Sequence, residues 1–487
     1  MINAIGLIYL IFNLVSLQAY SCPIELTPKT TAMELLKAKK VVVKKDVDLA
    51  GARLVFNDNT KLNFKGGTIS NGEVVLNNAE LNGDVRLLCR VAGSIKNKNV
   101  YVDWFLPNND LDVLYRNGFY SLTGFEDVSF QKPLYVIGVR GKNDGIRISN
   151  ITIDGRGATI RAKDGGRTTN SMLVFTECEQ IKIKNLVLRG TGVQSDEEGA
   201  RHNMCLNKCK SVVVEDVVSH DAFTDGLYIR KCDDVRVYRF ESYHAGRQGC
   251  SITAGTNIFF NQCVFDGSYR VAPKSGFDIE ANYSTDMIDN INIKNCRFTN
   301  NAATGLTINL RTSETARSCN ISVDDCYFEG NAVNISMRSA PNSGAGVIEI
   351  CNSLLRNSRG VSFQSKCYSA VGTPWVKFHD STIENANLGG GKDVREQATL
   401  ISVHNVSSSP LQGDYGHIKM YNLVLRQALS LSDKIKRAVN IYPDPQWNVS
   451  DVDISGIKYE IDKVEDRTFR RISVPKDKVK RVKISVQ

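Results

Sequence analysis

The sequence predicts a parallel β-helix, an all-β solenoid whose coils stack along one axis. Short strand patterns recur with a period in the twenties. Helical periodicity is nearly absent from the same region, which argues against a doubly wound α/β fold. Cysteines also return at equivalent places in successive repeats. A β-sandwich does not need the same strand to recur in register, whereas a solenoid does, so these observations favour the solenoid.

The repeats consist of two kinds of strand. Six segments place a glycine, or Ala332, before an alternating apolar and polar strand: "TDGLYIRK", "RQGCSITA", "KSGFDIEA", "ATGLTINL", "GNAVNISM" and "SRGVSFQS". Second strands lie between them: "NIFFNQCVFDGS", "NINIKNCRFTNN" and "NISVDDCYFEGN". Asn, Asp and Gly, which tolerate tight turns, join the strands. Each repeat is therefore expected to form one coil, with equivalent residues of neighbouring coils about 4.8 Å apart.

The thirteen cysteines follow the same repeat. Free cysteine is among the most buried residue types. We therefore expect mostly reduced thiols stacked inside the solenoid rather than disulfides, in two ladders: Cys263, Cys296 and Cys326, and Cys178, Cys209 and Cys232.

The N-terminus predicts export. The first 21 residues carry no Lys, Arg, Asp or Glu, and the apolar run "AIGLIYLIFNLVSL" suits a signal peptide better than a membrane span. Ala19 and Ser21 supply the small residues of a cleavage site, and Cys22 follows, where a lipid could be attached. We expect a protein that is periplasmic, extracellular or lipid-anchored at a bacterial cell surface, with membrane contact only through Cys22.

The net charge of +9 lies wholly in the predicted mature chain. Such a charge suits an anionic partner, and an acidic polysaccharide is one class of such partner. The segment 463–483 is markedly basic, and a solvated face is the favoured interpretation of such a run. It lacks interleaved aromatic residues, so no nucleic-acid partner is expected.

Several segments resemble one known superfamily. "YVDWF" (101–105), "NITIDGRGATIRA" (150–162), and the pair "AGRQGCSI" and "APKSGFDIE" are similar to the right-handed parallel β-helix superfamily of pectate lyases, polygalacturonases and phage tailspikes. The resemblance covers roughly residues 50–390. It implies a single-stranded, right-handed β-helix with an N-terminal cap near residues 104–122. This fold hosts lyases, hydrolases, epimerases and inert adhesins, so it implies carbohydrate chemistry without choosing a reaction.

The expected organisation is one continuous solenoid from about residue 50 to beyond 385. A signal peptide (1–21) precedes the N-terminal cap and first coils (22–145). The central β-helix follows (146–390), and C-terminal β-rich coils with the basic tail complete the chain (391–487).

The resemblance implies a groove over the strands that follow the glycine turns. Polar, charged and aromatic outward positions concentrate on the coils from 201 to 311. Asp278 and Glu280 alternate with core residues on one strand, so both carboxylates share a face with their Cα atoms about 6.7 Å apart. Unpaired, they would raise one another's pKa. We therefore expect Arg247, Lys274 or Arg311 beside them, or a calcium ion held by their oxygens.

Three functions remain open. In a polysaccharide lyase, which the Arg and Lys residues near the acids favour, Asp278 and Glu280 would hold Ca²⁺ and Lys274 or Arg247 would be the base. In a polygalacturonase-like hydrolase, Asp225 would be one acid and Asp278 or Glu280 the other. In a glycan-binding scaffold, the acids would only pair with Arg247 and Lys274. The expected substrate-binding residues are Arg201, His202, Tyr228, Arg230, Gln248, Asn309 and Arg311.

Overall fold

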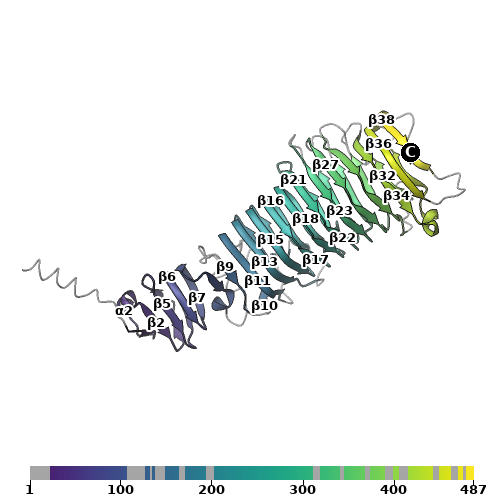
Figure 1. Ribbon diagram of the computed structural model, residues 1–487. Helices are drawn as coiled ribbons and strands as arrows, with labels where there is room; N and C mark the ends of the chain where they lie inside the picture. Colours follow the sequence, from purple (N-terminus) through teal and green to yellow (C-terminus); the bar gives the residue numbers. More distant parts are fainter. Residues whose placement is uncertain are drawn as a thin grey trace, which may run out of the picture.

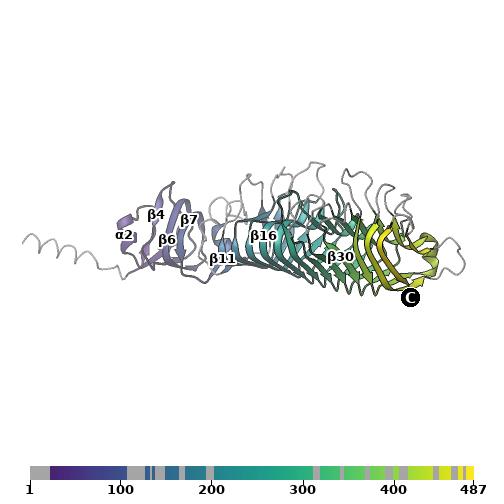
Figure 2. The same cartoon turned by 90° about the horizontal axis from the view of Figure 1, so that it is seen from above.

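The computed structural model confirms an elongated all-β solenoid (Figure 1). The strands stack along one axis from helix α2 at one end to the C-terminus at the other (Figure 2). Every pairing between described strands is parallel, and the β-helix is right-handed. The structure describes residues 22–106, 127–131, 134–137, 148–163, 171–192, 202–310, 318–339, 345–367, 373–389, 399–404, 415–442, 449–461, 470–474 and 479–486.

The N-terminal strands form a sheet of their own. Helix α2 (Ala32–Lys37) begins at Thr31, whose hydroxyl accepts a hydrogen bond from the Glu34 backbone in a capping box. No helix among the described residues is long and apolar enough to cross a membrane. The seven strands of this sheet are β1 (Ile24–Glu25), β2 (Lys40–Val43), β3 (Val47–Asp48), β4 (Arg53–Val55), β5 (Lys61–Phe64), β6 (Ile69–Gly83) and β7 (Leu87–Ile95).

The remaining strands form a second sheet that wraps into three faces, because from β19 to β33 each strand pairs with the third strand after it. Face 1 contains β12 (Leu173–Thr176), β14 (Met204–Asn207), β20 (Phe277–Glu280), β23 (Thr304–Leu310), β26 (Val333–Ser339), β29 (Phe363–Cys367), β32 (Thr399–His404), β35 (Arg437–Tyr442) and β37 (Arg470–Ser473). Face 2 contains β8 (Asn99–Tyr101), β9 (Asp127–Ser129), β21 (Ile288–Lys294), β24 (Ile321–Asp324), β27 (Val347–Cys351), β30 (Trp375–His379), β33 (Tyr415–Tyr421) and β38 (Val479–Val486).

Face 3 consists of shorter strands, and several long strands bend across two faces. Face 3 contains β10 (Leu134–Ile137), β17 (Glu241–Tyr243), β19 (Val264–Asp266), β22 (Arg297–Thr299), β25 (Tyr327–Glu329), β28 (Leu354–Arg356), β31 (Thr382–Glu384) and β34 (Val424–Gln427). Faces 2 and 3 share β11 (Ser149–Ala162), β13 (Glu179–Arg189), β15 (Lys210–His220) and β36 (Val449–Ile461), whereas faces 1 and 2 share β16 (Asp225–Tyr238) and β18 (Gln248–Asn261). Two short 3₁₀ helices are η1 (Val102–Phe105) and η3 (Leu429–Lys434).

The predicted continuous solenoid contains one place, near its N-terminal end, where the described strands do not pair from coil to coil. Among the described residues, strand pairing stops at β7 and begins again at β8. The coils differ in length on the two sides: Val41 pairs with Leu62 and Leu62 with Leu81, whereas Leu206 pairs with Ile229 farther along the chain. The predicted leader (1–21) lies outside the described residues, as does the predicted cap (104–122) apart from 104–106.

The predicted cysteine ladders are confirmed. The Cys263 backbone N–H donates to Cys296 Sγ at 3.4 Å, and the Cys209 N–H donates to Cys232 Sγ at 3.3 Å. The twelve cysteines that the structure describes are free, and all except Cys22 and Cys205 are buried. Stacking within the solenoid, rather than cross-linking, therefore explains their spacing.

The glycine before each face-1 strand is explained by the approach of the next coil. A Cβ atom on Gly249 would lie 2.5 Å from the carbonyl oxygen of Gly276, and one on Gly276 would lie 2.8 Å from that of Gly305. Both distances are shorter than real Cβ contacts. The glycines therefore let successive face-1 strands start in register, which positions the site described below.

Candidate functional site

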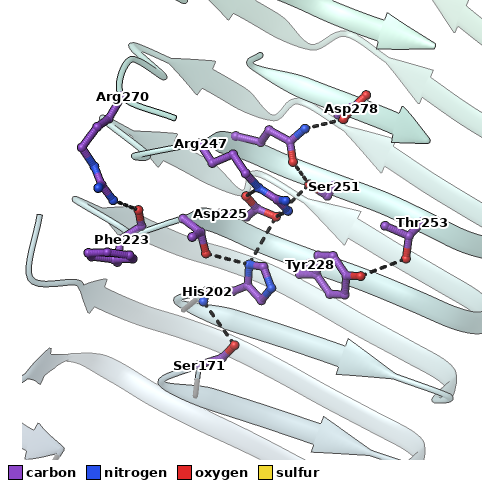
Figure 3. Close-up of polar contacts among 12 residues, drawn as sticks. Ser171, His202, Phe223, Asp225, Tyr228, Arg247, Ser251, Thr253, Arg270 and Asp278 are labelled. Carbon is purple, nitrogen blue, oxygen red and sulfur yellow. Dashed lines mark hydrogen bonds and ion pairs between the residues drawn. The ribbon is translucent and has the colours of Figure 1, made fainter. Parts of the chain in front are cut away.

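The face-1 register brings the predicted site residues together. Cys205 pairs with Tyr228, Tyr228 with Ser251, Ser251 with Asp278, and Asp278 with Thr307, so one outward column crosses five coils. Glu280 pairs with Asn309 in the neighbouring column. Figure 3 shows the polar contacts that link the coils of β14 to β20.

Asp225 is the most enclosed charge of this group, with none of its surface exposed. Arg247 donates to both its oxygens, from Nε at 2.8 Å and from Nη2 at 2.6 Å. Ser251 Oγ donates to Oδ2 at 2.8 Å, and His202 Nδ1 lies 3.2 Å from the same oxygen. Burial alone would raise the pKa of Asp225, but His202 and Arg247 outweigh it and hold this pKa well below its usual value. Asp225 is therefore a fixed carboxylate.

Asp278 differs from Asp225 because its surroundings disfavour the charged carboxylate, although it lies one coil from Arg247. It is 2% exposed, and Gln248 donates its side-chain amide to Oδ2, while Oδ1 has no hydrogen-bond partner. Gln248 Oε1 also lies within hydrogen-bond reach of Ser251 Oγ, whose single O–H is shared with Asp225, so two side chains link Asp278 to Asp225. Burial, and next the charge of Glu280, raise the pKa of Asp278 well above its usual value. Its surroundings therefore favour the protonated acid.

The charge of Arg247 acts on Asp278 and lowers its pKa, as a neighbouring cation is expected to do, but the ion pair that Arg247 forms is with Asp225. Arg247 directs its hydrogen bonds to Asp225, and Glu280 Oε1 accepts one from Asn309 Nδ2 at 2.6 Å. The physical reason is burial: Asp225 is fully enclosed, so its charge needs the guanidinium more than a half-exposed Glu280 does. The predicted Arg201 and Arg311 lie outside the described residues.

Aromatic and cationic side chains surround the acids. The His202 ring stacks on Tyr228 with centroids 4.3 Å apart, and the Tyr228 hydroxyl accepts a hydrogen bond from Thr253 at 3.2 Å. Burial raises the pKa of Tyr228. Arg230 lies 5.8 Å from the centroid of the Tyr283 ring, which is 57% exposed. The partly exposed side chains on this part of face 1 are Tyr228, Arg230, Arg247, Lys274, Glu280 and Asn309.

Sequence analysis did not select Ser251, Thr224 or Tyr283 for a role. Ser251 bridges Asp225 and Gln248, and Thr224 Oγ1 lies 3.1 Å from His202 Nδ1. Their residue types are common on solvated strands, so only the coil register indicates a role. The outward alternation of Ser251 on its strand was the one available signal.

The residues expected to hold calcium are the carboxyl groups of Asp278 and Glu280. Asp278 Oδ1 is a buried oxygen without a hydrogen-bond partner, which is a feature of cation sites. However, the described residues contain no group of three or more His, Cys, Asp or Glu side chains placed to hold a metal. Asp278 and Glu280 would supply only a minority of the six to eight oxygens that calcium takes. Calcium binding therefore stays a prediction, and no step below uses the ion.

Comparisons with known proteins report no matching family model and no matching curated protein. Solved structures of similar fold include the A-module of an Azotobacter vinelandii mannuronan C-5 epimerase, with 13% identity, a TM-score of 0.46, and coverage of 72% of this chain and 91% of that one. A capsular polysaccharide depolymerase tailspike of Acinetobacter baumannii bacteriophage Fri1 has 15% identity, a TM-score of 0.48, and coverage of 77% and 66%. A Thermotoga maritima exopolygalacturonase has 11% identity, a TM-score of 0.46, and coverage of 73% and 91%. At these identities the likeness concerns the fold alone, so the reaction must be argued from the site.

Proposed function

We propose that this protein is a carbohydrate-active enzyme that hydrolyses an acidic polysaccharide on face 1. The observation that carries the proposal is the unlike surroundings of two neighbouring carboxyl groups. Asp278 is buried with a raised pKa, whereas Glu280, two residues later on the same face, is partly exposed and accepts a hydrogen bond from Asn309. Two carboxyl groups in unlike surroundings, one adapted as an acid and the other as a base, are the basis of acid and base catalysis of glycoside hydrolysis.

In this proposal Asp278 is the general acid and Glu280 is the general base. Asp278 gives its proton to the glycosidic oxygen as the bond from that oxygen to the anomeric carbon breaks. Glu280 takes a proton from a water molecule whose oxygen bonds to the anomeric carbon. The Cα atoms of two residues on one strand face are about 6.7 Å apart, and inverting enzymes hold their carboxyl groups about 6.5 to 9.5 Å apart to leave room for the water. Because Asp278 is 2% exposed, the substrate must displace the side chains that cover it.

Asp225 has a positioning role in this account. A general acid must hold a proton near the working pH, and Asp225 has a strongly lowered pKa and no exposed surface. It fixes Arg247 instead, whose side chain is 31% exposed. The hydrogen bonds to Asp225 use Nε and Nη2, so Nη1 is left for a carboxylate of the substrate. Arg247, Arg230, Lys274 and the net charge of +9 support an acidic substrate.

A polysaccharide lyase is the second candidate, and the fixed guanidinium of Arg247 favours it. Elimination across a uronic acid requires a cation to neutralise the carboxylate and a base to remove the C5 proton. Burial lowers the pKa of Arg247, but the charge of Asp225 raises it more, so Arg247 keeps its proton. Arg247 can therefore neutralise the substrate carboxylate but cannot act as the base. Lys274, in the turn before β20, would then be the base.

The test is a panel of uronate-containing and neutral polysaccharides incubated with the protein, in calcium and in chelator. Reducing ends and the ultraviolet absorbance of unsaturated uronates are both followed. The proposal expects new reducing ends without absorbance, equal in calcium and in chelator. Absorbance accompanying the reducing ends would establish the lyase. Binding without cleavage, unchanged in Asp278→Asn and Glu280→Gln variants, would establish a glycan-binding scaffold and overturn both enzymatic candidates.

A further inference from the structure

A cavity lies on face 2, around the bend of the same strands that carry the site. Its volume is about 520 Å³, within the range of small-ligand sites. The lining residues come from β16, β18 and β21, which pair in that order and lie side by side in Figure 1. They include Arg236, Tyr238, Asn257, Phe259, Asn290 and Asn292.

Two aromatic rings form part of the cavity wall. Phe259 points outward between Ile258 and Phe260, which are both fully buried, and Tyr238 follows the buried Val237. Their rings meet edge to face with centroids 5.8 Å apart. Both side chains are only half-buried, so apolar ring surface faces the cavity. Rings of this kind provide large contact area for a ligand that also carries polar groups.

Side-chain amides form a second part of the wall. Asn290 Nδ2 donates to Asn257 Oδ1 at 2.7 Å, and Asn292 Nδ2 donates to Asn290 Oδ1 at 2.9 Å. An amide has two N–H donors and two acceptor lone pairs, so this chain of contacts leaves donors and acceptors for a ligand. A row of fixed amides beside two rings matches a sugar, which has apolar C–H faces and hydroxyl groups around its rim.

The cavity is electrically balanced. Arg236 Nε lies 3.2 Å from Asp234 Oδ1, and this ion pair accounts for the charged groups that line the cavity. Face 1 differs, because the partly exposed Arg230, Arg247 and Lys274 lie on its strands or in the turns before them. A uronate carboxylate would find no unpaired cation among the cavity's lining residues, whereas a neutral sugar needs none.

We propose that this face-2 cavity binds a neutral sugar residue and holds a polysaccharide without cleaving it. The inference goes beyond the proposed hydrolysis and does not depend on it, since binding here uses none of the face-1 acids. It applies to neutral polysaccharides and to polymers that contain neutral sugars among acidic ones.

The test is native electrophoresis through gels that contain galactomannan, xyloglucan, dextran or polygalacturonan, using the full chain. At least one neutral polymer is expected to retard the protein. The double variant Tyr238→Ala with Phe259→Ala should weaken this binding at least tenfold, whereas Tyr269→Ala, which alters an exposed ring outside the cavity, should not. The Asp278→Asn variant should be retarded like the wild type, which separates this site from the proposed cleavage.

Three outcomes would overturn the proposal. The first is no retardation by any neutral polymer, and the second is retardation that survives the double variant. The third is loss of a dimer in the double variant without any change in glycan binding, which would make face 2 an interface between copies of the chain. Because the double variant could unfold, its thermal melting is measured, and Asn292→Asp provides a second variant that leaves both rings in place and should also weaken binding.

Discussion

Arg247, on the coil after that of Asp225, donates a hydrogen bond to each carboxylate oxygen of Asp225, at 2.8 Å and 2.6 Å. Asp225 is fully buried, so its charge depends on partners supplied by neighbouring coils rather than on water. The bidentate contact therefore stabilises the stacking of two coils and also orients the cation that we assign to the substrate carboxylate.

Replacing Arg247 by alanine should destabilise the protein more than replacing it by lysine. Alanine leaves the buried Asp225 charge without its main partner, and breaking a buried pair costs about 3 to 5 kcal/mol. The side chain of Arg247 is 31% exposed, so we expect the lower end of this range. Urea unfolding of R247A and R247K measures the difference. Equal stability of R247A and wild type would show that Asp225 does not need the guanidinium.

The stability contributed by Asp278 should fall as pH rises. Its folded-state pKa is raised, so above the unfolded value of about 3.9 the unfolded chain releases a proton that the folded protein keeps. Stability is therefore lost from about pH 4 upward until the folded pKa is passed. Asp278→Asn removes this loss, so its melting temperature should rise relative to wild type between pH 4 and pH 7. A difference that is constant over this range would contradict a raised pKa.

The stability contributed by Asp225 should change with pH in the opposite direction to that of Asp278. Its folded-state pKa is lowered, so the stability it contributes is present above about pH 3.9 and is lost as pH falls toward the folded value. Asp225→Asn should therefore be less stable than wild type at pH 6, and the gap should narrow below pH 4. Unfolding free energies between pH 2.5 and 6 measure the gap. If the difference in unfolding free energy between wild type and Asp225→Asn widens as the pH falls, the folded-state pKa of Asp225 is not lowered.

The buried thiols should be reduced but unreactive in the native protein. Burial raises the pKa of Cys89 and Cys319 to about 12, which removes the reactive thiolate. Titration without reductant should find most of the thirteen cysteines only after unfolding in urea. If fewer than half of them react in urea, disulfides are present and the ladder account fails.

The repeat and its core were predictable from sequence because strand alternation, turn residues and stacked cysteines all follow the chain locally. The contacts that outward residues make from one coil to the next could not be predicted from the sequence. Arg230 pairs with Ala254 because a bulge shifts the register after Ile229, although simple alternation would set it opposite Thr253. The shift is local, because Cys232 pairs with Gly255 and the strand there returns to the register that it has at Ile229.

The pairing of Arg247 illustrates the same limit. The sequence predicted that Arg247 lies near Asp278, because both belong to successive face-1 coils. Whether Arg247 pairs with Asp225 or with Asp278 depends on which acid is more buried, and one sequence does not reveal that. The break in strand pairing between β7 and β8 was not predicted from the sequence either.

The most direct test of the central claim is the kinetics of Asp278→Asn and Glu280→Gln on a polysaccharide that the wild type hydrolyses, together with a dinitrophenyl glycoside of the same sugar. General acid or base catalysis contributes about 10²- to 10⁴-fold, so both variants should lose kcat on the polysaccharide by a factor in this range. The dinitrophenyl leaving group needs no proton, so Asp278→Asn should recover most of its rate on that substrate, whereas Glu280→Gln should not. Unchanged kcat in Asp278→Asn on the polysaccharide would contradict the assignment of Asp278 as the acid.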